Sequence, residues 1–213
     1  MSGPLGPAER PRSPSISELL ERHGTDSPAA SGAGAAVMAV LRDGARDVEV
    51  LLIERAERPD DPGSGQIALP GGHVEPSDPD LRATALRELE EEVGLTESDL
   101  LPPIRYVGAA EARWFKTSVG IFAARLGPSA LRPRRASAGE VASVFWLPRS
   151  TLSATERVSR PTSGGPVEVD ATLFEGHVLW GFTRRVLREF FLGPEPGGVG
   201  FAPTREDRYR PRP

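Results

Sequence analysis

The spacing of apolar and polar positions divides the chain into several short strand-like runs. Each run is rich in valine, leucine, isoleucine or phenylalanine, and glycine, proline or aspartate occupies many of the segments between runs, as is typical of strands joined by turns. The predicted strands cover residues 35–42, 48–54, 104–110, 117–125, 142–147 and 167–174. A shorter apolar run, 66–69, leads into a turn that we predict over residues 70–78.

Two segments instead carry the three-to-four-residue apolar spacing of amphipathic helices. The first covers residues 79–93, for which Asp78 is the expected N-cap, Pro79 the first helical residue and Gly94 the stop. The second covers residues 180–192. Two such helices among about seven strands predict an α+β domain with the layers of an α/β/α sandwich, not a doubly wound parallel sheet.

The two ends of the chain differ in composition from its centre. Residues 1–34 are rich in proline, serine, alanine and glycine, and we expect a flexible N-terminal segment with one short helix that begins at Ser15 or Ser17 and ends at Gly24. The folded domain is predicted over residues 35–192. Residues 193–213 are rich in glycine, proline and arginine, which predicts a loose C-terminal tail.

Composition and charge remove several classes of function. The 213 residues include no cysteine, so a disulfide framework, a thiolate metal site and a cysteine nucleophile are excluded. The formal net charge of −4 gives no general attraction to nucleic acids or anionic membranes. No apolar run is long enough for a transmembrane helix, and the N-terminus lacks the apolar region of a secretory signal. We therefore expect a cytoplasmic protein without a nucleic-acid or membrane partner, and a homodimer stays open.

The helix over residues 79–93 carries the candidate chemistry. At 100° per residue, Glu88, Glu91 and Glu92 fall on one edge beside the apolar face, and Arg87 can pair with Glu91 four residues later. Like charges at this spacing repel by a few tenths of a kcal/mol per pair, and they lie at the unfavourable end of the helix dipole. A hard divalent cation would relieve that repulsion. By itself the helix fits a metal site and a solvated acidic face equally well.

The segment before this helix favours the metal site. Gly71 and Gly72 allow the backbone to approach a ligand closely, and Glu75 and Asp78 add carboxylates just ahead of the helix. A glycine pair, an acidic loop and a helix reading Arg-Glu-x-x-Glu-Glu are much less expected together by chance than any one of them alone.

This combination resembles the signature of the Nudix hydrolases, G-x5-E-x7-R-E-U-x-E-E-x-G-U, in which U is a bulky aliphatic residue. Gly72 opens the match, and the segment from Arg87 to Leu95 follows the second half of the signature without a gap. Asp78 stands at the position of the first glutamate, and eight residues instead of seven separate it from Arg87. Both departures resemble the coenzyme A pyrophosphatase subgroup.

Segments outside the signature extend the resemblance to roughly residues 35–192. LLIER (51–55) and GQIALPGG (65–72) are similar to the upstream motif of that subgroup, and EVASVFWLP (140–148) and VLWGFT (178–183) are similar to two downstream segments. Two positions depart from it: Asp61 stands where the subgroup usually has a second arginine, and Leu69 replaces a phenylalanine.

The resemblance implies a Nudix fold with a mixed sheet and hydrolysis of a nucleoside diphosphate linked to another group. The implied metal ligands for Mg²⁺ or Mn²⁺ are Glu88, Glu91 and Glu92, with Arg87 orienting them. Arg55, Gly71 and Gly72 are the implied substrate contacts, with the Gly71 carbonyl as a further metal ligand. Glu88 and Glu140 are the two candidates for the general base, although for Glu140 a solvated loop carboxylate is the favoured interpretation.

Three functions follow as hypotheses. The first is hydrolysis of coenzyme A or acyl-coenzyme A to 3′,5′-ADP and 4′-(acyl)phosphopantetheine. The second keeps the reaction but takes ADP-ribose, a dinucleotide or a nucleoside triphosphate as substrate. The third is a Nudix module that binds a nucleotide without hydrolysis. The complete set of Arg87 and its three neighbouring glutamates favours an enzyme, because a binding module has no need of clustered carboxylates.

Overall fold

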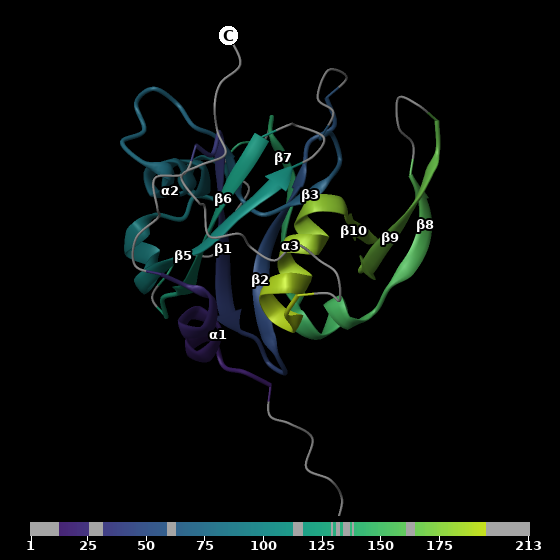
Figure 1. Ribbon diagram of the computed structural model, residues 1–213, viewed down its shortest axis with the longest axis horizontal. Coiled ribbons are helices and arrows are strands. Elements are labelled where there is room, and N and C mark those ends of the chain that lie inside the picture. The colour runs from purple at the N-terminus through teal and green to yellow at the C-terminus, as the bar shows by residue number, and fades with distance from the viewer. Residues whose placement is uncertain are drawn as a thin grey trace, which may run out of the picture.

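A computed structural model describes residues 13–25, 32–58, 63–112, 117–128, 130, 133, 137, 139–160 and 165–194 (Figure 1). The helices are α1 (Ile16–His23), α2 (Leu81–Val93) and α3 (Gly181–Leu192), with 3₁₀ turns at Glu97–Asp99 and Arg149–Ser153. The strands are β1 (Ala35–Asp43), β2 (Val48–Arg55), β3 (Ile67–Ala68), β4 (Gly71–His73), β5 (Leu100–Ala112), β6 (Thr117–Leu126), β7 (Val141–Pro148), β8 (Glu156–Arg160), β9 (Val167–Phe174) and β10 (His177–Trp180). All six predicted strands are present, and β4, β8 and β10 were not predicted.

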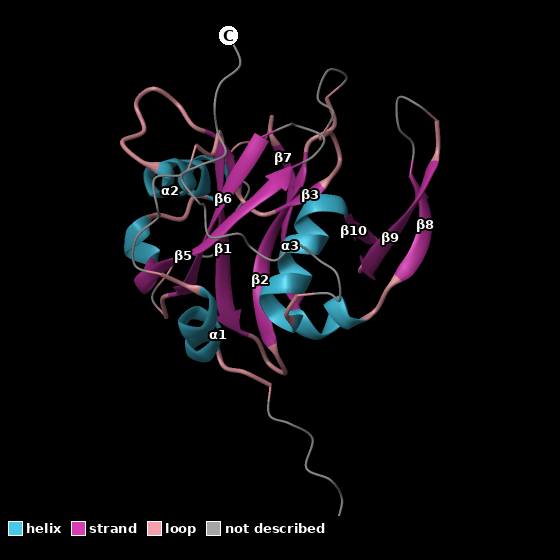
Figure 2. Ribbon diagram, in the orientation of Figure 1, coloured by secondary structure: helices cyan, strands magenta, loops and turns pink. Residues whose placement is uncertain are grey.

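A mixed sheet forms the centre of the domain. Its strands follow the order β3-β2-β1-β6-β5, with β4 paired to β1 and β7 paired to β2. The pair β1 and β6 is parallel, with Ala36 opposite Gly120, and the other pairs of this sheet are antiparallel. The strands β10, β9 and β8 form a smaller antiparallel sheet, which Figure 2 shows at one side of the molecule beyond α3.

Helices cover both faces of the central sheet. On β1, Met38 and Val40 belong to the apolar cluster shared with α2, whereas Ala39 and Leu41 belong to the cluster shared with α1 and α3. Burial on both faces explains why the strands read as nearly continuous apolar runs in place of alternating ones. The predicted α/β/α sandwich is confirmed (Figure 1).

The short N-terminal helix belongs to the core of the domain. Ser15 caps α1 by accepting a hydrogen bond from the Glu18 amide, and the Glu18 carboxylate accepts one from the Ser15 amide in return. Ile16 and Leu19 are fully buried against the central sheet and α3. Residues 1–12 and 26–31 of the expected flexible segment, and 195–213 of the expected tail, lie outside the described residues.

Two local predictions about the signature region were wrong. The helix α2 begins two residues later than predicted, and Asp80 is its N-cap, accepting a hydrogen bond from the Ala83 amide at 2.8 Å. Asp78 cannot cap this helix because Arg87 and Thr84 bind its carboxylate. The predicted turn over 70–78 also contains β4, which pairs with β1.

No described helix has the length and apolar character needed to cross a membrane.

Candidate functional site

The guanidinium of Arg87 organises the acidic groups around α2. Its Nη1 donates to Glu88 Oε1 at 2.9 Å and to Glu91 Oε2 at 3.1 Å. Its Nε and Nη2 bind both oxygens of Asp78 at 3.1 Å, and Nη2 also donates to the His73 carbonyl at 3.0 Å. The predicted pairing of Arg87 with Glu91 is confirmed. Arg87 also ties the helix to the loop that precedes it.

Asp78 is the fixed end of this network. Besides the two bonds from Arg87, it accepts a hydrogen bond from the Thr84 hydroxyl at 2.9 Å. The hydrogen bond from Arg87 holds the pKa of Asp78 well below its usual range, and the same pairing raises the pKa of Arg87. Thr84 is fully buried, and the sequence analysis missed it because the spacing of a single threonine carries no recognisable signal.

Glu92 lies deeper than the other glutamates, with 4% of its surface exposed. Its Oε2 accepts a hydrogen bond from the Gly71 amide at 2.9 Å. Burial raises the pKa of Glu92 to about 7, and the charges of Glu88 and Glu140 add to this effect. The Gly71 hydrogen bond and the positive charge of Arg55 oppose it. A nearby cation would therefore stabilise the ionised form of the Glu92 carboxyl group.

The two glycines of β4 allow this close approach. A Cβ on Gly72 would overlap the carboxylate of Glu88, and a Cβ on Gly71 would overlap the backbone of β1 at Ala36. Gly71 also has a φ of 153°, at the edge of the region that side chains rarely occupy. Glycine at both positions therefore brings β4 within contact distance of α2 on one side and β1 on the other.

The carboxylates suit a hard cation in their chemistry. Burial raises the pKa of Glu88, and the charges of Glu91 and Glu140 add to this rise, so the acidic groups repel one another across the site. Oxygen ligands of this kind are those that Mg²⁺ and Mn²⁺ prefer. Among the described residues no three acidic or histidine side chains are already gathered around one point. Arg87 donates hydrogen bonds to both Glu88 and Glu91, so one oxygen of each of these carboxylates is already paired.

Glu140, the second candidate for the general base, stands immediately before β7. Its carboxylate lies 3.5 Å from Nη2 of Arg58, whose Nε donates to the Gly139 carbonyl at 2.8 Å. The backbone is joined here as well, because the Ala56 amide donates to the Glu140 carbonyl at 2.8 Å. Its negative charge contributes to the raised pKa of both Glu88 and Glu92.

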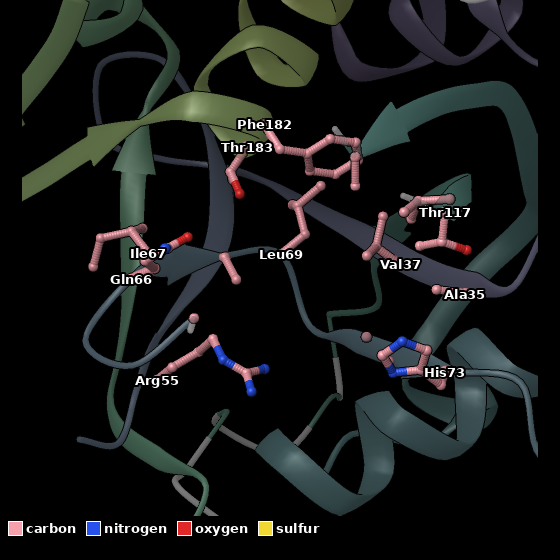
Figure 3. A pocket seen from close by; sticks show the side chains of 16 residues that line it. Ala35, Val37, Arg55, Gln66, Ile67, Leu69, His73, Thr117, Phe182 and Thr183 are labelled. Atoms are coloured by element: carbon pink, nitrogen blue, oxygen red, sulfur yellow. The ribbon is translucent and has the colours of Figure 1, made fainter. Parts of the chain in front are cut away.

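A cavity of about 220 Å³ adjoins this acidic cluster (Figure 3). The predicted substrate contacts Arg55, Gly71 and Gly72 all line it. The three glutamates are not among its lining residues, so the structure separates the sequence-predicted residues into a cavity group and a carboxylate group. Gly71 belongs to the first and is hydrogen bonded to the second.

The cavity also contains residues that the sequence analysis did not single out. Gln66, Phe182 and Thr183 lie on its wall. The sequence signal was present, since Gln66 stands in GQIALPGG and the other two in VLWGFT, but only the tertiary structure shows that these two segments meet at one cavity. Asp61, which departs from the related pattern, lies outside the described residues.

The fold and the signature together identify the family of the chain. A sequence model described as the NUDIX domain matches residues 32–163, more than half of the chain. The chain therefore belongs to the Nudix family. Within this family it is a pyrophosphohydrolase of nucleoside diphosphates linked to another moiety.

Two curated relatives agree with the family assignment. The chain is similar to the uncharacterized Nudix hydrolase NudL of Salmonella paratyphi B, with 33% identity over 137 residues that cover 61% of this chain and 67% of the relative. The NudL protein of Salmonella newport gives the same figures. Among solved structures, a Nudix hydrolase from Alicyclobacillus acidocaldarius has 22% identity and a TM-score of 0.49, covering 77% of this chain and 93% of that chain.

Proposed function

We propose that this protein hydrolyses the diphosphate of coenzyme A or acyl-coenzyme A, producing 3′,5′-ADP and 4′-(acyl)phosphopantetheine, with Mg²⁺ or Mn²⁺ as cofactor. One observation carries the hydrolytic site. Gly71 both lines the cavity and donates its amide to the buried carboxylate of Glu92, so a substrate cavity meets an acidic cluster at one residue. The choice of coenzyme A is supported by the sequence, through the position of Asp78 and the segments 51–55 and 65–72.

Each group has a distinct task in this proposal. Glu88, Glu91 and Glu92 would hold the metal, which would offset negative charge on the diphosphate and make a nearby water more acidic. Arg87 orients two of these carboxylates through Nη1. Arg55, on the cavity wall, offers a positive charge to a substrate phosphate. Little covalent help is needed, because phosphoryl transfer depends mainly on positioning and charge stabilisation.

The proton of the attacking water requires an acceptor. Glu88 and Glu140 are the candidates, and the negative charge of Glu140 contributes to the raised pKa of Glu88. Arg87 donates a hydrogen bond of 2.9 Å to Glu88, whereas among the described residues the carboxylate of Glu140 has one side-chain contact, with Arg58 at 3.5 Å. We therefore assign the general base to Glu140, whose weaker engagement leaves its carboxylate more readily available.

The test is product analysis with two matched variants of α2. Purified protein is incubated with coenzyme A and Mg²⁺ or Mn²⁺, and products are identified by mass. Glu92→Gln removes a buried carboxylate with little change in volume, and we expect turnover to fall by about 100-fold or more, as for other residues that stabilise charge in a transition state. Glu90→Gln makes the same chemical change at an exposed position of the same helix, and turnover should be preserved.

The outcomes separate substrate from reaction. Release of 3′,5′-ADP and 4′-phosphopantetheine, lost only in Glu92→Gln, supports the proposal. Cleavage of ADP-ribose or NADH but not coenzyme A would keep the reaction and overturn the substrate. Full turnover by Glu92→Gln would overturn the metal assignment. Absence of product across the panel would favour a nucleotide-binding module.

A further inference from the structure

The strand β8 has an outer edge that no described strand covers. The smaller sheet has the order β10-β9-β8, so β8 pairs with β9 on one side only. Figure 2 shows β8 as the outermost strand at that side of the molecule, with no described element beyond it. The backbone N–H and C=O groups along such an edge can pair with a strand of another chain. The edge of β8 is therefore a candidate surface for contact with another protein chain.

The three charged side chains of β8 differ in whether the domain neutralises them. Arg157 forms an ion pair with Asp170 on the neighbouring strand, with 3.2 Å between Nη1 and Oδ1. Glu156 and Arg160 each lie opposite an apolar residue of β9, which offers them no charge. Among the described residues neither Glu156 nor Arg160 has a hydrogen bond or an ion pair, and the Nε of Arg160 is buried. One negative and one positive charge of the edge strand therefore lack a partner within the described part of the chain.

Pairing of β8 with a second β8 would give both charges a partner. Side chains alternate between the two faces of a strand, so Glu156, Val158 and Arg160 share one face. In an antiparallel pair centred on Val158, Glu156 of each copy lies opposite Arg160 of the other, and Arg157 lies opposite Ser159. A pair centred on Arg157 would set that arginine opposite itself. A pair centred on Ser159 would leave Glu156 opposite no residue of β8. The charges therefore favour a single register.

We propose that a second copy of this chain pairs along the outer edge of β8, which joins the two smaller sheets into one across a two-fold axis. Charges on an edge strand usually prevent such pairing, because they conflict with those of the incoming strand. The order of the charges along β8 instead makes this strand complementary to itself. Self-complementarity is what a two-fold interface requires, since both copies present the same surface.

The side chain of Arg160 has to turn outward to meet the second copy. Its guanidinium carbon now lies 5.8 Å from the centre of the Trp180 ring, close to the limit of about 6 Å for a cation–π contact. A carboxylate offers a guanidinium direct, charge-assisted hydrogen bonds, which are stronger. The strand contributes five residues, fewer than the roughly 20–30 per side of a stable interface. We therefore expect a weak dimer, with a dissociation constant on the order of 10–100 µM.

The experiment measures the monomer–dimer equilibrium of the full chain by sedimentation velocity, from about 5 to about 500 µM. Glu156→Arg and Arg160→Glu each place like charges opposite one another at both ends of the pair, and we expect each to weaken dimerisation by about tenfold or more. An equimolar mixture of the two variants should form a heterodimer about as readily as the wild type dimerises, because a positive strand then meets a negative one. Arg46→Glu reverses a charge at an exposed turn between β1 and β2 and should leave the dimer unchanged.

Recovery in the mixture supports the proposal, because mixing would not correct a folding defect in either variant. The double variant with Glu156→Arg and Arg160→Glu exchanges the two charges and should dimerise like the wild type, which tests the pairing even if a single variant does not fold. A wild type that stays monomeric over the whole range overturns the proposal, as does a dimer that neither reversal weakens. Loss in both variants without recovery in the mixture would overturn the pairing centred on Val158. None of these outcomes depends on the proposed function, because no substrate is present.

Discussion

At the scale of single residues, Arg87 has more bonding partners than its place in a charged run indicates. Its three nitrogens reach Asp78, Glu88, Glu91 and the His73 carbonyl. A lysine keeps the charge but has one nitrogen on a flexible stem, so it cannot hold these groups at once. We expect Arg87→Lys to lower kcat by at least about tenfold while KM changes less, because the bound geometry of the carboxylates is disturbed. Steady-state kinetics with the cleaved substrate measures this.

Arg82→Lys is the matched control on the same helix. Arg82 pairs with Glu97 at the surface, away from the acidic cluster, and surface ion pairs contribute about 0–1 kcal/mol. Its kcat should stay within about twofold of the wild type. Equal losses in both variants would mean that Arg87 acts only through the general stability of α2.

At the scale of elements, the contact between β4 and α2 depends on a missing side chain. Gly72→Ala would place a methyl group on the carboxylate of Glu88. We expect Glu88 to be displaced, activity to fall by about tenfold or more, and the unfolding midpoint to drop, since overpacking costs about 1–3 kcal/mol. Activity assays and thermal unfolding together detect this change.

Gly139→Ala tests the same substitution where space exists. The nearest atom to its added Cβ, Arg58 Nη2, would be 3.6 Å away, an ordinary contact distance. This variant should keep its unfolding midpoint. If Gly72→Ala behaves like Gly139→Ala, the close approach of β4 and α2 is not required.

The helix α1 is expected to unfold together with the sandwich. Leu19 is fully buried in the cluster shared with α3 and the central sheet, so Leu19→Ala should lower the free energy of unfolding by about 2–5 kcal/mol. Glu21→Ala, on the exposed side of α1, should change it by less than about 0.5 kcal/mol. Urea denaturation followed by tryptophan fluorescence measures both. A negligible loss in Leu19→Ala would show that α1 is not docked in solution.

At the scale of the whole molecule, the burial of Glu92 links stability to pH. Its folded-state pKa of about 7 lies above the ordinary value of 4.5, so the folded protein binds this proton more tightly than the unfolded chain. The resulting stability is fully present below about pH 4.5 and is lost as pH rises through 7. At about 1.4 kcal/mol per pKa unit, the loss is on the order of 3 kcal/mol in metal-free protein.

Comparison with Glu92→Gln isolates this effect, because glutamine does not titrate. With chelator present, the variant should gain stability relative to the wild type as pH rises from 5 to 8. Asp78 does not contribute to this change, because its pKa is lowered and it titrates below pH 5. Added Mg²⁺ should then stabilise the wild type more than Glu92→Gln at pH 8. A constant difference between the two proteins from pH 5 to 8 would contradict the buried-carboxyl explanation.

Local pattern was sufficient for much of the architecture. Strongly apolar runs predicted the long strands, because a strand that is buried on both faces of a sheet needs apolar side chains at successive positions. Ser15 was one of two predicted caps of α1, together with Ser17, and the structure selects Ser15. The strand β4 was missed, because Gly71 and Gly72 have low strand propensity and are held in place by pairing with β1.

The start of α2 shows how tertiary contacts override a local signal. Asp78 and Asp80 are both acceptable N-caps by residue type. Asp78 is removed from that role by Arg87, nine residues along the chain and on the same helix, and Thr84 adds a third bond. The two-residue difference matters for the site, because it frees Asp78 to anchor the arginine that holds Glu88 and Glu91.

The sequence alone determined the layered α+β class and the acidic edge of one helix, because helix and strand periods and local spacing encode them. It also supplied the glycine pair and the family resemblance. Only the tertiary structure decided that Glu92 is buried against Gly71, that Arg55 and Gly71 line one cavity, and that Thr183 lines the same cavity from a distant helix. These relations depend on which elements pack together, and burial, which shifts the Glu92 pKa, exists only after they have packed.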